Sequence, residues 1–289
     1  MHVYIITLVI SLLLSYASLK VNDKRIRIIL QILSAIPFFV ISAIRYDVGT
    51  DYLYRYRADF EYIKRGGTPP NLEIGFLMLV KLCLLVSKNY SLLFVVTSAM
   101  IIFMIFFLIY KYSKKPVLSI FIFFAGCFFF QSMNVIRQYI ACAIVLLSYQ
   151  LLIEKKYKLW IPCVVVAFLI HTTSIVSVLA IFLTRKIIAK PAVMVILIVT
   201  ILLFGGVFNS IIDAVMLNTR FSVYVGSKYD RGDIKYIALV VNTILYGICY
   251  YVLKKKQEIT RTDILYINIM GMSILFSVMG NVYFLFNRI

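Results

Sequence analysis

Residues Ser91–Tyr110 read SLLFVVTSAMIIFMIFFLIY, a run without a single charged side chain. A helix of about 20 residues rises about 30 Å, which matches the hydrocarbon core of a bilayer. Such a run predicts a membrane-spanning helix. The whole chain fits this class, because 63% of its 289 residues are hydrophobic and its mean hydropathy is +0.97. Soluble globular proteins are much less apolar.

Other apolar runs of spanning length occur along the chain. They lie at Val3–Leu19, Ile26–Ile44, Val117–Phe130, Tyr139–Ile153, Ala192–Asn209, Tyr236–Leu253 and Ile264–Phe286. Two more are interrupted, Leu72–Val86 by Lys81 and Leu159–Leu183 by His171. We expect an all-α polytopic transmembrane helix bundle of about nine to eleven membrane segments, some short or re-entrant. Residues 1–289 are predicted to form a single integral membrane domain.

Positive charge is concentrated in the short loops between these runs. The formal net charge is +18, and most of the Lys and Arg residues stand at 20–27, 111–115, 155–158, 185–190 and 254–261. The positive-inside rule makes these loops cytoplasmic. Two longer polar loops, Arg45–Glu73 and Ser210–Lys235, have nearly balanced charge and are expected outside. Because the charge follows the topology, we expect no nucleic-acid partner.

This topology constrains the two interrupted regions. The loops on either side of Leu159–Leu183 both carry the basic signature, so the segment between them should cross an even number of times. We expect two half-helices, 159–170 and 172–184, that meet near His171, whereas a single tilted span would place one basic loop outside. Leu72–Val86 is expected to be interfacial or re-entrant. Non-helical backbone at membrane depth needs protein or a wet cavity around it, so both regions indicate an outward-facing cavity.

The first outer loop opens with Arg45–Tyr52, RYDVGTDY. Arg binds phosphate oxygens in a forked geometry, Asp accepts hydrogen bonds from hydroxyls, and Tyr rings pack on sugars. Arg45, Asp47, Tyr52 and Tyr54 are therefore candidate ligands for a polar, anionic substrate. Asp51 is a candidate base. The alternatives are that Asp47 and Asp51 only shape a turn and that the alternating tyrosines form an interfacial strand or belt.

A second polar cluster, Gln131–Gln138, separates two apolar runs. Asn134, Arg137 and Gln138 recur at i, i+3 and i+4, which predicts one shared helix face near the outer end of the bundle. An arginine held there suits a phosphate or pyrophosphate. The competing interpretation is an arginine that snorkels at a helix end.

His171 is a candidate general base, since imidazole titrates near neutral pH. It is equally compatible with a structural histidine bonded to a neighbouring hydroxyl. Glu73 opens the doubtful third apolar segment, and Arg220 stands in the second outer loop, which could also be an ordinary solvated loop.

Metal, nucleotide and disulfide chemistry find no support in the sequence. All five cysteines, Cys83, Cys127, Cys142, Cys163 and Cys249, stand in apolar stretches without ligand spacing. Phosphate-binding glycine loops and metalloprotease motifs are absent from the sequence. We expect no metal and no cofactor.

Four motifs occur in a characteristic order. They are Arg45 with Val48-Gly49-Thr50-Asp51-Tyr52, Glu73-x-Gly75-Phe76, Asn134-x-x-Arg137-Gln138 and His171-x-x-Ser174. As an ordered set they resemble the EpsG family of bacterial exopolysaccharide and capsule membrane proteins, which are similar in role to Wzy-type polymerases. The chain departs from the family pattern at His171, where His-x-Ser is more usual. Family members also tend to continue beyond the last span seen here.

The resemblance implies an enzyme of the bacterial cytoplasmic membrane that polymerises lipid-linked oligosaccharide repeat units at the outer face. Its substrate would be an undecaprenyl-pyrophosphate-linked oligosaccharide, and its surroundings would include membrane lipid and other polysaccharide assembly proteins. Catalysis would involve His171, Arg137 and Asp51. Substrate binding would involve Arg45, Asp47, Tyr52, Tyr54, Glu73, Asn134, Gln138 and Arg220. Alternative functions are a flippase or transporter of lipid-linked glycans, a non-catalytic assembly partner, and an acyltransferase.

Overall fold

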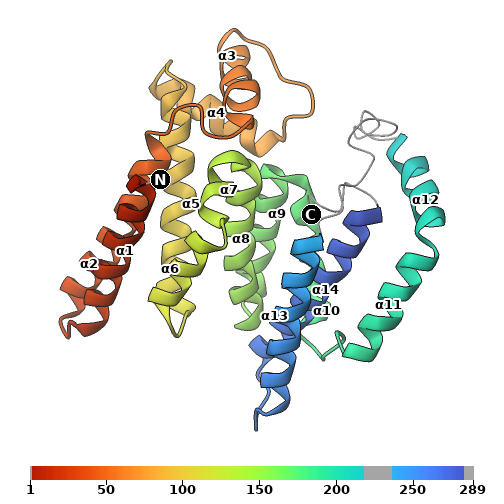
Figure 1. Cartoon of the computed structure of the whole chain (residues 1–289). Helices are drawn as coiled ribbons and strands as arrows, with labels where there is room; N and C mark the ends of the chain where they lie inside the picture. The colour runs from red at the N-terminus through yellow and green to blue at the C-terminus, as the bar shows by residue number, and fades with distance from the viewer. Residues whose placement is uncertain (1, 218–235, 283–289) are drawn as a thin grey trace. The chain divides into compact units, whose positions relative to one another are not determined.

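The computed structural model describes residues 2–217 and 236–282, and these are helical with short connections and no strand (Figure 1). The prediction of an all-α polytopic bundle is confirmed. Contacts group the chain into two compact units. Unit 1 comprises Met1–Leu151 and Lys156–Ile175, and unit 2 comprises Leu152–Lys155 and Val176–Ile289. The single membrane domain stays a prediction.

Within the described residues, five single helices are long and apolar enough to cross a membrane. They are α1 (His2–Lys20), α2 (Lys24–Ala43), α5 (Ser91–Tyr112), α8 (Ile136–Ile153) and α14 (Arg261–Val282). Two bent helix pairs add up to two further spans, α6 (Pro116–Ala125) with α7 (Phe128–Asn134), and α11 (Pro191–Leu203) with α12 (Gly205–Leu217). The shorter apolar helices are α4 (Ile74–Val86), α9 (Tyr157–Ile170), Thr172–Leu183, and the end of α13 (Tyr236–Lys254).

Where α1 pairs with α2, polar side chains are buried and large apolar side chains are exposed, which is the reverse of the arrangement in soluble proteins. The buried side chains of α1 are small and polar, Thr7, Ser11, Ser15 and Ser18, whereas its large apolar side chains are mostly exposed. Ser11 Oγ donates to the carbonyl of Ser34 on α2 over 2.7 Å. Small residues let membrane helices approach closely, and apolar residues face lipid. This surface is that of a multi-pass membrane protein.

Two of the predicted spans are bent. Val117–Phe130 breaks at Gly126–Cys127, where α6 and α7 diverge by 56° and Cys127 has a left-handed backbone with φ 61°. Ala192–Asn209 breaks at Phe204, with an angle of 65° between α11 and α12. The hydrophobicity of both runs is uniform, and the local feature at each break is a glycine, Gly126 or Gly205. Pro116 and Pro191 stand at the first turns of α6 and α11, where the missing backbone N–H of proline costs no helical hydrogen bond.

The break predicted at His171 is present, whereas the interfacial or re-entrant placement of Leu72–Val86 stays a prediction. Helix α9 ends at Ile170, His171 has extended backbone, and a 3₁₀ segment η2 (Thr172–Leu179) and α10 (Ala180–Leu183) follow. The half-helix boundary at His171 is therefore confirmed. Helix α4 is a separate short helix ahead of the long span α5.

The first outer loop is more ordered than the sequence indicated. A π-helical turn η1 (Tyr52–Arg57) continues into α3 (Ala58–Lys64), so the suggestion of an interfacial strand is wrong. Tyr52 and Tyr56, four residues apart, are buried, while Tyr54 is 87% exposed. The helical period therefore decides which tyrosines face the core. The second outer loop, Ser210–Lys235, is helical up to Leu217, and its remainder lies outside the described residues.

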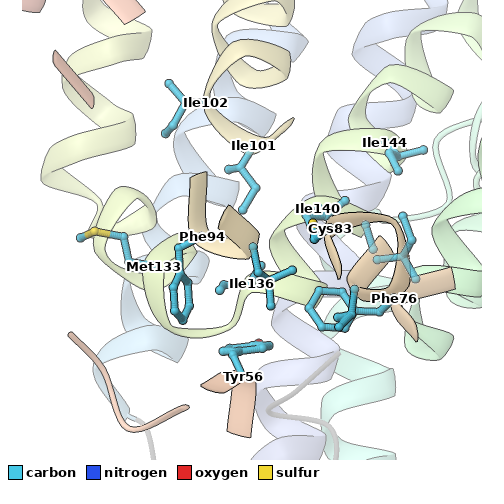
Figure 2. Packing of buried hydrophobic residues seen from close by; sticks show 14 of the residues in the cluster. Tyr56, Phe76, Cys83, Phe94, Ile101, Ile102, Met133, Ile136, Ile140 and Ile144 are labelled. Atoms are coloured by element: carbon cyan, nitrogen blue, oxygen red, sulfur yellow. The ribbon is translucent and has the colours of Figure 1, made fainter. Parts of the chain in front are cut away.

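The core of unit 1 joins the outer-loop helices to the spans. Figure 2 shows Tyr56, Phe76 and Ile136, from η1, α4 and α8, lying close together. Tyr56 and Phe76 are 5.8 Å apart between ring centroids. This contact fixes the loop on the starts of α4 and α8, where the polar motifs stand.

Unit 2 has its own small core and a polar clamp. Asn268 of α14 is buried and bonds four backbone groups of the connection between α10 and α11. Its Oδ1 accepts from the amides of Ile188 and Ala189, and its Nδ2 donates to the carbonyls of Leu183 and Lys186. An asparagine with both ends satisfied fixes a loop at low cost in the membrane.

Candidate functional site

Three of the predicted site residues meet in unit 1. Glu73 caps the start of α4, Arg137 lies in the first turn of α8, and His171 follows the end of α9. Arg137 Nη1 donates to Glu73 Oε2 in an ion pair. His171 Nδ1 lies 3.4 Å from the other carboxylate oxygen, Oε1. The Glu73 carboxylate therefore stands between the arginine and the histidine.

The Glu73 side chain is only 6% exposed, and that of Arg137 is 13% exposed. Burial by itself would raise the pKa of the Glu73 carboxyl, but the polar contact with His171 and the charge of Arg137 outweigh it and lower the pKa to about 2. Glu73 is therefore a carboxylate at neutral pH and balances the charge of Arg137.

A close helix contact holds the cluster together. A Cβ added at Gly75 would lie 2.7 Å from the carbonyl oxygen of Leu169, so glycine lets α4 approach the end of α9. Glu73 stands two residues before Gly75, and His171 stands two residues after Leu169, so both lie next to this contact. The Glu-x-Gly motif thus has a packing reason as well as a chemical one.

Asn134 lies in a different place from that predicted. Helix α7 ends at Asn134 and α8 begins at Ile136, so Asn134, Arg137 and Gln138 do not share one helix face, and that prediction is wrong. Asn134 Oδ1 accepts from the backbone amide of Asp51 over 3.1 Å. Gly49, with φ +86°, leaves room for this side chain. Asn134 therefore fastens the outer loop to the end of α7, beside the start of α8.

Tyr56 connects the loop to the cluster and was missed at the sequence level. It is buried, which raises the pKa of its hydroxyl, while the charge of Arg137 opposes and that of Asp51 adds to the rise. Asp51 and Arg137 therefore both act electrostatically on the Tyr56 hydroxyl. The usable signal was the spacing of four residues between Tyr52 and Tyr56, which places both on one helical face.

Arg45 forms a second basic site near the end of α2. Its Nη1 donates to the hydroxyls of Ser98, over 3.0 Å, and Ser42, over 3.1 Å. The guanidinium lies 4.7 Å from the ring centroid of Phe94, on which Tyr52 also stacks at 4.4 Å. Burial lowers the pKa of Arg45 to about 10, which leaves it charged at neutral pH. Its fixed position makes it a cation of defined geometry.

The ends of the helices that carry these groups point the same way. Helices α2 and α9 start beside basic loops, and their ends are followed closely by Arg45 and His171. Helix α8 runs the other way, with Arg137 in its first turn and a basic loop after its end. The cluster therefore lies at the helix ends opposite to the basic loops. A model of the EpsG family matches residues 28–289.

The chain belongs to the EpsG family. Searches among curated proteins and among solved structures found no match. Membership of the EpsG family indicates a multi-pass membrane protein of bacterial polysaccharide biosynthesis. The resemblance inferred from the four motifs is thereby confirmed.

The remaining predicted residues of this EpsG-family chain lie around the cluster or apart from it. Asp47 is exposed, with a left-handed backbone at φ 51°, which suits its turn alternative. Tyr52 is buried in an aromatic stack, and Tyr54 is exposed to solvent. Gln138 follows Arg137 on α8 and is half-buried. Arg220 lies outside the described residues.

Proposed function

We propose that this protein polymerises lipid-linked oligosaccharide repeat units for exopolysaccharide, capsule or O-antigen at the outer face of the bacterial cytoplasmic membrane. The substrate is a glycan on undecaprenyl pyrophosphate. The observation that carries the proposal is the meeting of Arg137, Glu73 and His171 at the helix ends opposite to the basic loops. Membership of the EpsG family supports the pathway.

The chemistry needs a cation for the leaving group and a base for the acceptor. An acceptor sugar hydroxyl forms a bond from its oxygen to the anomeric carbon of the donor glycan. The bond from that carbon to the pyrophosphate oxygen breaks, and the electron pair leaves with the lipid pyrophosphate. Arg137 stabilises the charge that develops there, and His171 takes the hydroxyl proton. The glycosyl–pyrophosphate bond supplies the free energy.

His171 is favoured over Asp51 as the base because it shares a carboxylate with Arg137. A base and a leaving-group cation must both reach one anomeric centre, and residues within one cluster satisfy this condition. Asp51 lies near the same cluster through Tyr56 and can contact sugar hydroxyls. Arg45 and exposed Tyr54 extend the binding surface towards the glycan and its phosphates.

The test is the size of lipid-linked glycan in cells that lack the gene, complemented at matched protein levels. Wild type should restore long chains, whereas Arg137→Ala and His171→Ala should leave single repeat units outside. Arg25→Ala, an exposed arginine at the opposite end of α2, is the control and should behave as wild type. Repeat units trapped on the cytoplasmic face would indicate a flippase. Long chains in the null strain would indicate an accessory role.

A further inference from the structure

The Glu73 carboxylate has two oxygens and serves two different residues. Oε2 accepts from Arg137, and Oε1 lies 3.4 Å from Nδ1 of His171. The three residues come from three separate helices, so the arrangement is tertiary and not a local turn. A buried carboxylate placed in this way links the state of one partner to the state of the other.

The two contacts are unequal. The ion pair with Arg137 is close, whereas the contact to His171 is long and lacks hydrogen-bond geometry, so Nδ1 is a buried nitrogen without a hydrogen-bond partner. The His171 side chain is nevertheless 20% exposed. Since Nδ1 is shielded, this exposure belongs to its other atoms. A small movement of the carboxylate away from Arg137 would complete the bond to Nδ1.

We propose that Glu73 is a positioning residue that couples anion binding at Arg137 to the proton-accepting form of His171. This inference rests on the proposed function. A pyrophosphate that takes the donors of Arg137 releases Oε2, and the carboxylate then closes on His171. Glu73 accepts from Nδ1–H, which leaves the lone pair on Nε2. The base is therefore complete only when the donor is bound.

In the reaction, the hydroxyl oxygen of the acceptor bonds to the anomeric carbon as the carbon–pyrophosphate bond breaks. The proton passes to Nε2, and the electron pair of the broken bond stays on the pyrophosphate beside Arg137. The imidazolium that forms is stabilised by the negative charge of Glu73. The pyrophosphate leaving group then provides the negative charge beside Arg137 that the Glu73 carboxylate provided before it moved to His171.

The other ionisable residues around the cluster are the same in wild type and in the Glu73 variants. Helix α8 contributes Arg137, and the segment of η1 and α3 contributes Tyr56, Asp51 and Asp59, which all interact with Arg137 or with each other. None of them is changed when Glu73 is replaced. A difference between Glu73 variants therefore reports on the carboxylate.

The chain offers a clean spectroscopic test because it has two histidines, and His2 is exposed near the N-terminus. We would record ¹⁵N spectra of histidine-labelled His2→Gln protein in lipid nanodiscs, with and without inorganic pyrophosphate. Pyrophosphate should increase the Nδ1–H tautomer of neutral His171 at least twofold. Glu73→Gln should abolish the response and Glu73→Asp should restore part of it. Glu61→Gln, at a partly exposed acid of α3 that pairs with Lys64, is the matched control.

Two results would overturn the coupling: no pyrophosphate-dependent change in the His2→Gln protein, or the same change in Glu73→Gln. The first result is measured without any Glu73 variant, so it does not depend on whether such a variant folds. In polymer assays, Glu73→Gln should move the acidic limb of the pH–rate profile to lower pH, which a merely structural role would not do. A tautomer response without any polymer from lipid-linked repeats would keep the coupling and reject the polymerase.

Discussion

Replacement of Gly75 by alanine tests the packing on which the candidate site depends. The residue lies in the first turn of α4 with ordinary helical backbone, so helix propensity alone predicts that alanine stabilises the protein by up to about 1 kcal/mol. The tertiary structure predicts the opposite. The added Cβ would lie 2.7 Å from the carbonyl oxygen of Leu169 and 2.8 Å from its carbonyl carbon.

The magnitude follows from these distances. Carbon atoms pack at about 3.5 Å or more, so α4 and the end of α9 must separate by about 0.7 Å. Both neighbours are backbone atoms and cannot rotate away. Overpacking of this kind costs about 1–3 kcal/mol, which exceeds the helix gain. The same shift separates Glu73 from His171, and a misplacement of about 1 Å at a reacting centre reduces the rate about 100-fold.

The assay is the midpoint of thermal unfolding in detergent together with polymer yield at matched protein levels. Gly75→Ala should lower both. The control is Gly247→Ala in α13, where an added Cβ meets nothing within 4 Å, and it should leave the polymer yield unchanged. A Gly75→Ala protein that is as stable as wild type and fully active would refute the packing argument.

Further substitutions test the ion pair and the first outer loop. The pKa of Glu73 is about 2 in the folded protein against an ordinary value of 4.5, so the stability that its carboxylate contributes is complete above about pH 4.5 and is lost as the pH falls towards 2. Glu73→Gln should remove this loss of stability in acid. The measurement is the midpoint of unfolding at several pH values between about 3 and 6. Gly49→Ala should reduce stability by about 1 kcal/mol or more, because its φ of +86° and the nearby Asn134 side chain both disfavour a Cβ, whereas Gly206→Ala meets open space; equal unfolding midpoints for the two variants would contradict this. Tyr52→Phe keeps the stack on Phe94 and should preserve polymer yield, whereas Tyr54→Ala, at an exposed position, should leave stability unchanged and weaken glycan use; a large loss with Tyr52→Phe would restore Tyr52 as a hydroxyl ligand.

The sequence alone predicted the class of the fold and much of its organisation. Long uncharged runs such as Ser91–Tyr110 can satisfy their backbone in a bilayer only as helices, so the all-α prediction follows from composition. The break at His171 was predicted because the basic loops on both sides required an even number of crossings. Ordered motifs at Arg45, Glu73, Arg137 and His171 identified the family. Each of these signals is a short motif, the hydrophobicity of one segment, or the charge of individual loops compared along the chain.

Only the tertiary structure decided which of these residues meet. Glu73 and Arg137 are 64 positions apart, and no periodicity relates them to His171. Asn134 was assigned to the face of Arg137 by helical spacing, but the break at Val135 turned it towards Asp51. Tyr52 lies in the core, and its predicted role in sugar binding stays a prediction. Such outcomes depend on how short helices cross and on where a glycine allows close approach, and those are properties of packed surfaces and not of any single segment.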